Sequence, residues 1–282
     1  MLTVTQVRHA ERRRRPPPSL MHQYQEYVMQ RVEGFKNSMS RDELLRLGDE
    51  AVSEMQATAE GQFVLTEVLM LESVDRIIIK RLRLRSYRRW RQQFLKLREA
   101  QREPTHWGLE PHCPIAPLLT RIEPHDHALV VGGGAEACAY LLSAHDAAVT
   151  FIAGDLGSVE RVESRIASEA LGSRFAAYVV QFGGWLPPLE APPSLVLLDL
   201  GALADMDAAV RVDFVQLAKA LTCAGGVHVL LVGGGTLAPE ALLSMYGGWT
   251  RDESGVGRRR GGGREGGLLL AKPADVGVTL PL

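Results

Sequence analysis

The sequence predicts an α/β fold: a doubly wound, mostly parallel sheet with an antiparallel C-terminal strand, preceded by an all-α segment. Three observations predict it. Residues 21–102 contain no proline and carry apolar residues at helical spacing. From residue 127 onward, short apolar runs alternate with helical patterns. The last two apolar runs, in 248–257 and 265–273, are joined by the loop RRRGGGR and read as an antiparallel pair at one sheet edge.

Composition sets the class of protein. The 282 residues are 46% hydrophobic and 23% charged, as in an ordinary globular chain of one large or two smaller domains. Three cysteines without a C-x-x-C pair argue against a disulfide framework and against a zinc site. No apolar run reaches the length of a membrane span. We therefore expect a cytoplasmic protein without a bound metal.

The chain is expected to have three parts. Residues 1–20 are basic and proline-rich and read as a flexible tail; 21–118 read as a helical cap domain with a linker, and 119–282 as the α/β domain. Ser40 and Glu43 form a capping-box pattern before an apolar face made of Leu44, Leu47, Ala51 and Met55. Ser86 is expected to cap a further helix, whose stripe is Tyr87, Trp90, Phe94 and Leu97. The proline-rich linker that follows is expected to lie on the α/β domain.

Within the α/β domain, the strands are expected at 128–131, 148–153, 177–181, 195–199 and 227–232, with helices at 158–171 and 206–221 among the segments between them. The first strand leads into three glycines and a helix, in ALVVGGGAEACAYLL (128–142). Such a turn lets a ligand approach the backbone and the free N–H groups of a helix N-terminus. Gly132, Gly134 and Ala137 also satisfy the dinucleotide fingerprint, with Asp155 near the place of a ribose-binding acid. A turn that merely closes a strand–helix unit is the alternative.

The order of motifs favours one ligand class. After the glycine turn come VTFIAGD, AAYVVQFGGWLPP, PSLVLLDLGAL, LTCAGGVHVLLV and EGGLLLAKP. Together they resemble the class I S-adenosylmethionine-dependent methyltransferases, over about the last 155 residues. The resemblance implies a Rossmann-like sheet that ends in an antiparallel pair, whereas a dinucleotide dehydrogenase would continue with a sixth parallel strand.

The resemblance also implies the cofactor, S-adenosylmethionine, and its site. Gly132, Gly133 and Gly134 match the loop beneath the methionine part, but Glu136 replaces a further glycine, and Val130 stands where an acid is usual. At the end of strand two, Ala153 replaces the ribose-binding acid, with Asp155 two residues later. The remaining implied contacts are Gln181 and Phe182 after strand three and Asp199 after strand four. Trp185 reads either as a stacking partner for adenine or as a buried hydrophobic residue.

Asp199 is the candidate catalytic residue, as a general base for a hydroxyl acceptor; its alternative role is to cap the loop after strand four. The segment DLGALAD (199–205) lacks the Asn/Asp-Pro-Pro-Tyr/Phe pattern of amino-group methylation. His125 and His127 flank Asp126, and we interpret this trio as a solvated turn before a strand because no second set of metal ligands is visible.

Charge is unevenly distributed. Residues 76–102 contain eleven Lys or Arg and one acid, so a segment at +10 leaves −11 for the rest of a chain whose net charge is −1. This segment reads either as an anion-binding face for nucleic acid or for an anionic substrate, or as a basic helix docked on the chain's own acidic domain. We favour the second and expect the helices to cap the carboxyl ends of the strands.

These observations predict an S-adenosylmethionine-dependent methyltransferase that acts on a small molecule and does not associate with membranes. The alternative is a catalytically degenerate protein of the same fold, which serves as a binding or scaffold subunit with nucleic acid as one candidate partner. A third interpretation is an NAD-dependent oxidoreductase.

Overall fold

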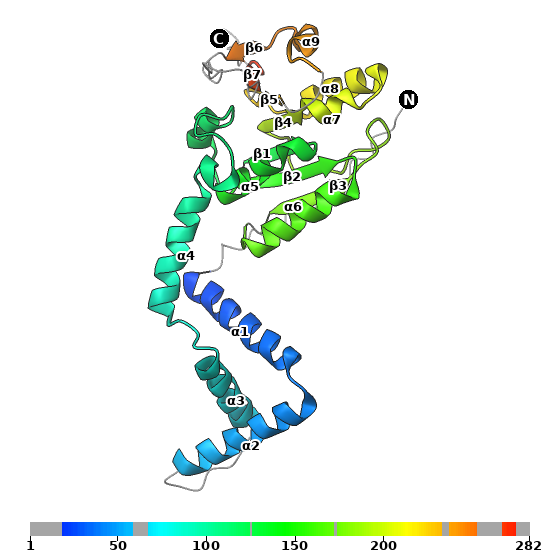
Figure 1. Ribbon diagram of the computed structural model, residues 1–282. Helices are drawn as coiled ribbons and strands as arrows, with labels where there is room; N and C mark the ends of the chain where they lie inside the picture. The colour runs from blue at the N-terminus through cyan, green and yellow to red at the C-terminus, as the bar shows by residue number, and fades with distance from the viewer. Residues whose placement is uncertain are drawn as a thin grey trace, which may run out of the picture. The chain divides into compact units, whose positions relative to one another are not determined.

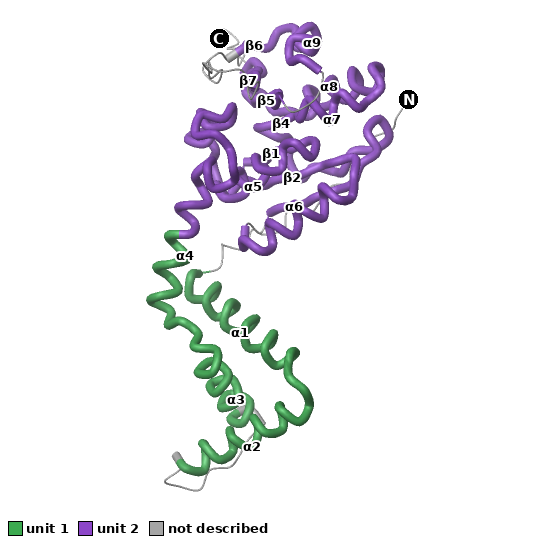
Figure 2. The backbone as a smooth tube through the Cα atoms, in the orientation of Figure 1, with its two compact units in different colours: residues 1–96 green, residues 97–282 purple. Residues whose placement is uncertain are grey.

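A computed structural model of the protein describes residues 19–58, 67–124, 126–171, 174–232, 237–252 and 267–274. The chain divides into two compact units, residues 1–96 and 97–282 (Figure 2). The division falls inside helix α4 (Tyr87–Gln101), so continuous secondary structure crosses it. The expected tail as far as residue 18 and the loop RRRGGGR lie outside the described residues.

The first unit is helical, as predicted (Figure 1). It contains α1 (Leu20–Ser38), α2 (Arg41–Thr58), α3 (Glu67–Arg81) and the first part of α4. The capping box is confirmed: the Ser40 N–H donates to Glu43 Oε2 (2.8 Å), and the Glu43 N–H donates to Ser40 Oγ (3.3 Å). The buried core is small and consists of Val32, Leu47, Ala51, Ile77 and Ile78. Leu44 is exposed, so the apolar face of α2 is narrower than its sequence predicts.

The second unit is built on one sheet. Within the described residues, seven strands lie in the order β3-β2-β1-β4-β5-β7-β6. Their bounds are β1 His127–Val131, β2 Ala148–Ala153, β3 Phe175–Val179, β4 Leu195–Asp199, β5 Val227–Leu231, β6 Thr250–Asp252 and β7 Gly267–Ala271. The first five strands are parallel, and β7 runs antiparallel to both β5 and β6. The Rossmann-like fold class is therefore confirmed, and the sixth parallel strand of a dehydrogenase is not present among the described residues.

Helices cover both faces of this sheet, because the central strands are apolar on both sides. On one face, α5 (Glu136–Ala144) and α6 (Leu156–Ser168) pack on alternate strand residues such as Val130 and Phe151. On the other, α7 (Leu200–Ala204), α8 (Ala208–Leu221) and α9 (Glu240–Leu243) cover residues such as Val131 and Leu198 (Figure 1). Successive side chains of a strand point to opposite faces of the sheet, so neighbouring residues pack against different helices.

The proline-rich segment packs on the α/β unit, as expected for the linker. It contains two short 3₁₀ helices, Pro104–Trp107 and Ala116–Arg121. Its residues Cys113, Ile115 and Leu118 are buried in the core cluster that α5 and α6 form with the sheet. The segment therefore belongs to the fold of the second unit. No helix within the described residues has both the length and the apolar content needed to cross a membrane.

Candidate functional site

The carboxyl ends of β1, β2, β3 and β4 converge at one edge of the sheet. Val131, the last residue of β1, pairs with Ile152 on one side and with Leu198 on the other. The chain reverses its direction of winding here, since β2 and β3 lie on one side of β1 and β4 and β5 on the other. Sheets of this kind bind ligands at such a switch point. The glycine turn after β1 lies at this point.

Backbone geometry requires glycine at position 132. Gly132 has φ 94° and ψ 150°, a region that side-chain-bearing residues essentially never occupy. A Cβ atom there would lie 2.6 Å from Ala202 Cβ and 2.7 Å from Asp199 Cβ. The Gly132 N–H donates to the carbonyl of Ile152 (2.8 Å), which ties the turn to β2. The turn is thus fixed by the chain's own packing.

Asp199 is held by the backbone around it. Its side chain is 6% exposed and accepts two hydrogen bonds, from the Gly134 N–H to Oδ2 (2.8 Å) and from the Gly201 N–H to Oδ1 (2.9 Å). A Cβ at Gly134 would lie 2.7 Å from Oδ2, so the carboxylate also needs glycine at that position. The geometry favours the capping role of Asp199, since this residue joins the glycine turn to the start of α7.

This arrangement predicts that Asp199→Asn destabilises the protein by about 2–3 kcal/mol, because the amide NH₂ would face a backbone N–H that now donates to a carboxylate. Urea unfolding measures the change. Asp205→Asn, at an exposed position at the end of α7, is the matched control and is expected to change stability by less than about 0.5 kcal/mol. Equal stability of the two variants would contradict the capping role.

The loop after β2 offers a carboxylate at an exposed position. Ala153 is buried, whereas Asp155 is exposed and caps α6, its Oδ1 accepting from the Ser158 N–H (2.7 Å). This hydrogen bond lowers the pKa of Asp155, so the side chain is ionised at neutral pH. The Ser158 side chain and the charge of Arg161 also lower this pKa, and within the described residues no hydrogen bond to the other oxygen, Oδ2, is formed. Asp155 therefore has one acceptor oxygen available beside the glycine turn.

Glu136 is directed toward α6. Arg161 Nη2 donates to Glu136 Oε1 (2.8 Å) and to Ser158 Oγ (2.9 Å). Ser158 Oγ in turn lies against the turn, because a Cβ at Gly133 would be 2.7 Å from it. These contacts join the starts of α5 and α6 across the glycine turn. The sequence reasoning did not find Ser158 or Arg161, because their role depends on packing between two helices.

The loop after β3 presents aromatic side chains. Phe182 lies near the end of β2, since a Cβ at Gly154 would be 3.5 Å from its ring, and it packs edge-on against Phe214 (5.3 Å between centroids). Trp185 is 55% exposed, so the interpretation of a buried hydrophobic residue is wrong. Gln181 is also exposed.

Apolar side chains at this edge of the sheet are left open to solvent. Leu156, directly after Asp155, is 58% exposed, and Val179 at the end of β3 is 45% exposed. We name Leu156, Val179 and Trp185, which lie at or after the carboxyl ends of β2 and β3, the apolar rim. Leu156 was not among the predicted site residues, although an apolar residue at the first position of a helix is a signal that could have found it.

Two other features lie outside this site. A wide, shallow depression follows α6 and is lined by Gly157, Glu160, Arg161, Ser164, Arg165 and Ser168. It adjoins the strand-end loops at Gly157 and Arg161 and extends from there along α6 to Ser168, so the chemistry described above argues for the loops as the candidate site. The interpretation of a solvated turn is wrong for His127, which is buried as the first residue of β1 beside Thr150 (Nε2 to Oγ1, 3.3 Å); His125 lies outside the described residues. The described residues contain no group of three or more His, Cys, Asp or Glu placed to hold a metal ion.

Comparison with known proteins gives a consistent but distant similarity. No family model and no curated protein matches the chain. Among solved structures, the N-methyltransferase NodS from Bradyrhizobium japonicum WM9 is 13% identical, with 65% of this chain and 96% of that chain covered and a TM-score of 0.44. An rRNA methylase from Streptococcus thermophilus is 11% identical (56% and 93% covered, TM-score 0.42). The glycopeptide N-methyltransferase MtfA, complexed with S-adenosylmethionine, is 13% identical (58% and 93% covered, TM-score 0.39). Each of these similar structures is a methyltransferase.

Proposed function

We propose that the chain binds S-adenosylmethionine at the carboxyl ends of β1 and β2 and transfers its methyl group directly to a small molecule. The observation that carries the proposal is the Gly132–Gly134 turn at the switch point of the sheet, with the ionised Asp155 on the neighbouring loop. A turn without side chains lets a ligand approach the backbone, and a carboxylate accepts hydrogen bonds from ribose hydroxyls.

The residues present fit this cofactor in part. Asp155 would hold the ribose through Oδ2, and Leu156 of the apolar rim would flank the adenine together with Phe182. Gln181, being exposed, would be available to the adenine amine. Val130 and Ala153 are apolar and buried, so no charge at these positions would orient the methionine part or bond the ribose. When bound, the cofactor supplies an electrophilic methyl group on a positively charged sulfur.

The hydrogen bonds that Asp199 accepts limit which kind of atom can receive the methyl group. Because both of its oxygens accept backbone N–H groups, this carboxylate is poorly placed to take a proton from a hydroxyl. The proposed acceptor atom is therefore one that is already nucleophilic at neutral pH, a nitrogen that is unprotonated at that pH or a thiolate sulfur. For such acceptors, alignment and proximity supply most of the rate acceleration.

A second candidate function is a binding or scaffold subunit without catalysis. It is favoured by one observation: the Cβ positions of Gly132, Gly133 and Gly134 are each blocked by a side chain of the protein, from Ala202, Asp199 or Ser158. The glycines are thus explained by internal packing alone. Since Val130 and Ala153 are apolar, the chain would then keep the fold of a methyltransferase without binding the cofactor.

Calorimetric titration separates these functions. We expect S-adenosylmethionine and S-adenosylhomocysteine to bind with micromolar affinity and NAD(H) not to bind. Absence of binding by all three supports the scaffold, and binding of NAD(H) alone would reject the methyltransferase.

The ribose contact is tested with a variant that keeps the helix cap. Asp155→Ser retains a capping oxygen for α6 but removes the carboxylate. We expect the affinity for S-adenosylmethionine to fall about 10- to 100-fold, the value of one charge-assisted hydrogen bond. Asp155→Ala also loses the helix cap, and its lower stability relative to Asp155→Ser measures the contribution of that cap. An unchanged affinity for S-adenosylmethionine in both variants would show that Asp155 is not part of the cofactor site.

A further inference from the structure

One side of α4 and the turn before it carry a row of exposed cations. We name these residues, Arg83, Arg85, Arg88, Arg89, Arg91 and Lys96, the basic ridge. The span 83–96 contains no acidic residue. Within α4, Arg88 and Lys96 are two helical turns apart, about 12 Å along the axis, with Gln92 between them.

Three other cations of residues 76–102 have acidic partners, which the ridge lacks within the described residues. Lys80 pairs with Glu54 (3.5 Å), Arg81 pairs with Glu50, and Arg102 pairs with Asp146 (2.9 Å). Where residues of the chain are described, none of the six ridge residues forms an ion pair. Arg85 donates instead to the side chain of Gln93. Ion pairs within each unit thus neutralise these three cations and leave the ridge charged. The docking of the basic segment on the acidic α/β domain, which the sequence favoured, stays a prediction.

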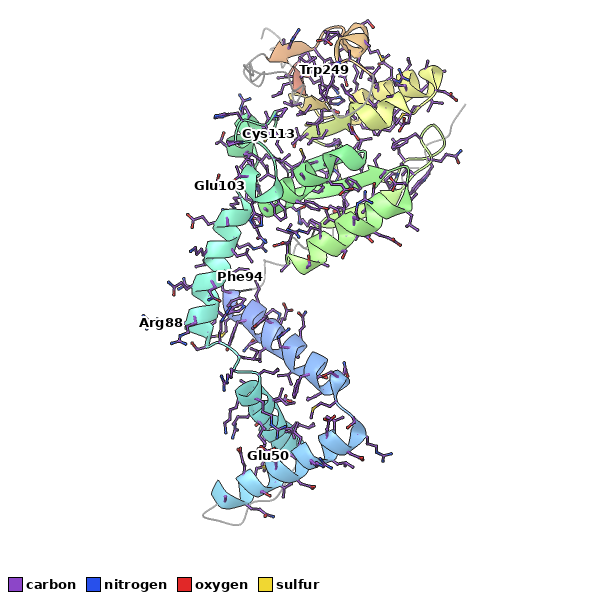
Figure 3. The ribbon with its side chains drawn as sticks, viewed as in Figure 1. Glu50, Arg88, Phe94, Glu103, Cys113 and Trp249 are labelled. Carbon is purple, nitrogen blue, oxygen red and sulfur yellow. The ribbon has the colours of Figure 1, made fainter. Side chains whose placement is uncertain are left out.

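The opposite side of α4 is packed on α1. Trp90 lies 5.4 Å from Tyr24 and 6.1 Å from Tyr27, and it stacks on Phe94 at 4.8 Å (ring centroids). The Tyr24 hydroxyl also donates to the carbonyl of Arg85 (2.9 Å). In Figure 3, Phe94 lies on the side of α4 toward α1 and Arg88 on the side away from it. These contacts fix which side of the helix faces outward.

The packing of the aromatic side distinguishes between two anionic partners. A helix that lies in a membrane surface inserts a continuous apolar face among the lipids. The aromatic residues Tyr87 and Trp90 of α4 are already in contact with α1, and only Leu95 and Leu97 of its large apolar residues are exposed. A phosphodiester chain needs only a row of exposed cations, and arginine binds phosphate through two parallel N–H donors. Five of the six ridge residues are arginines.

We propose that the basic ridge binds the phosphate backbone of nucleic acid without reading its sequence. Tyr87, Trp90 and Phe94 do not stack on bases, because they are packed in the helical unit. Recognition therefore depends on charge, and the affinity falls as salt is added. The inference does not rest on methyl transfer, since every ridge residue belongs to the helical unit.

The test uses fluorescence anisotropy of the full chain with labelled 20-nucleotide RNA and with duplex DNA. With about four phosphates neutralised, the affinity for the single strand is expected to fall about 50-fold between 50 and 200 mM salt. The triple variant Arg88→Ala/Arg89→Ala/Lys96→Ala is expected to bind at least about tenfold more weakly at 50 mM salt, with the slope of log K against log salt reduced by about 2.

A matched control removes the same number of charges elsewhere in the helical unit. Arg31, Arg41 and Arg46 are exposed on α1 and α2, and their triple alanine variant is expected to bind within about threefold of the unchanged protein. Equal losses in the two triple variants, or no binding to either nucleic acid at 50 mM salt, would overturn the proposal, as would binding to phosphatidylserine vesicles without binding to nucleic acid. Affinity of the ridge variant for S-adenosylmethionine is measured separately, so failure of this proposal is distinguishable from failure of the methyltransferase proposal.

Discussion

Gly132→Val is expected to abolish S-adenosylmethionine binding and to lower the free energy of unfolding by about 4 kcal/mol. Two effects add: a backbone conformation at φ 94° that valine cannot adopt without strain, and a Cβ within 2.7 Å of Ala202 and Asp199. Calorimetric titration measures the first result and urea unfolding the second. Unchanged affinity in a folded variant would show that the turn is not the cofactor site.

Two further variants separate strain from contact. Gly248→Ala has a similar φ of 83° but meets no atom within 4 Å, so it is expected to show only the strain, about 1 kcal/mol, with cofactor affinity unchanged. Gly134→Ala has no positive φ, but its Cβ would meet the carboxylate of Asp199 at 2.7 Å. It is expected to fold and to bind the cofactor more weakly, which keeps the test informative where Gly132→Val does not fold.

The protein is expected to lose stability below pH 6.5, to a large extent through one buried histidine. His228 on β5 is fully buried, and burial lowers its pKa to about 3, with the nearby charges of Lys219 and Lys272 acting in the same direction. The unfolded chain therefore binds a proton near pH 6.5 that the folded chain does not bind until near pH 3. Stability is fully present above pH 6.5 and falls by about 1.4 kcal/mol per pH unit below it, or about 2 kcal/mol by pH 5.

The hydrogen bonds of His228 explain why it stays neutral. Thr222 donates its hydroxyl proton to the carbonyl of Ala218 (2.7 Å), so its oxygen accepts the Nε2–H of His228 (2.8 Å). Nδ1 is then unprotonated and accepts from the Tyr246 hydroxyl (2.8 Å). The ring of Trp249, which lies beside β6 and β7, packs edge-on against the His228 ring, with 4.6 Å between the two centroids (Figure 3).

Urea unfolding between pH 7.5 and 4.5 measures this dependence. His228→Gln is expected to reduce the slope below pH 6.5 by most of 1.4 kcal/mol per unit, because glutamine does not titrate. Tyr246→Phe is the control: it loses one hydrogen bond, about 1 kcal/mol at pH 7.5, but keeps the buried imidazole and therefore the slope. Burial also lowers the pKa values of His127 and His145, so a small dependence of stability on pH is expected to remain in His228→Gln. Identical slopes in the unchanged protein and His228→Gln would contradict this assignment.

Much of the fold could be predicted from local sequence patterns. The ends of β2 and β4 are those of the predicted strands, because continuous apolar runs mark strands buried on both faces. The strand β3 begins two residues earlier and ends at Val179, since the chain past that point enters the turn around Gly183, whose φ is 88°. Edge strands such as β3 are partly exposed and give a weaker apolar pattern.

The position of the candidate site in the fold was predictable, but the contacts among its residues were not. The glycine turn and Asp155 follow strands that the sequence shows, so their arrival at one edge of the sheet follows from parallel topology. Glu136 was predicted as a cofactor contact, yet its ion pair is with Arg161, on another helix. For Trp185 the sequence left two interpretations, and its exposure excludes the buried one, so that stacking on adenine stays a prediction.

The sequence by itself determined the element order, the capping box at Ser40, the glycine turn and the excess of cations in residues 76–102, since each is a property of neighbouring residues. Only the tertiary structure decided that Asp199 braces Gly134, 65 residues away, and that the aromatic side of α4 faces α1 while the basic ridge faces outward. The reason is physical: hydrogen-bond partners, ion pairs and burial depend on segments far apart in the chain. The local spacing of apolar residues does not specify which distant segment supplies them.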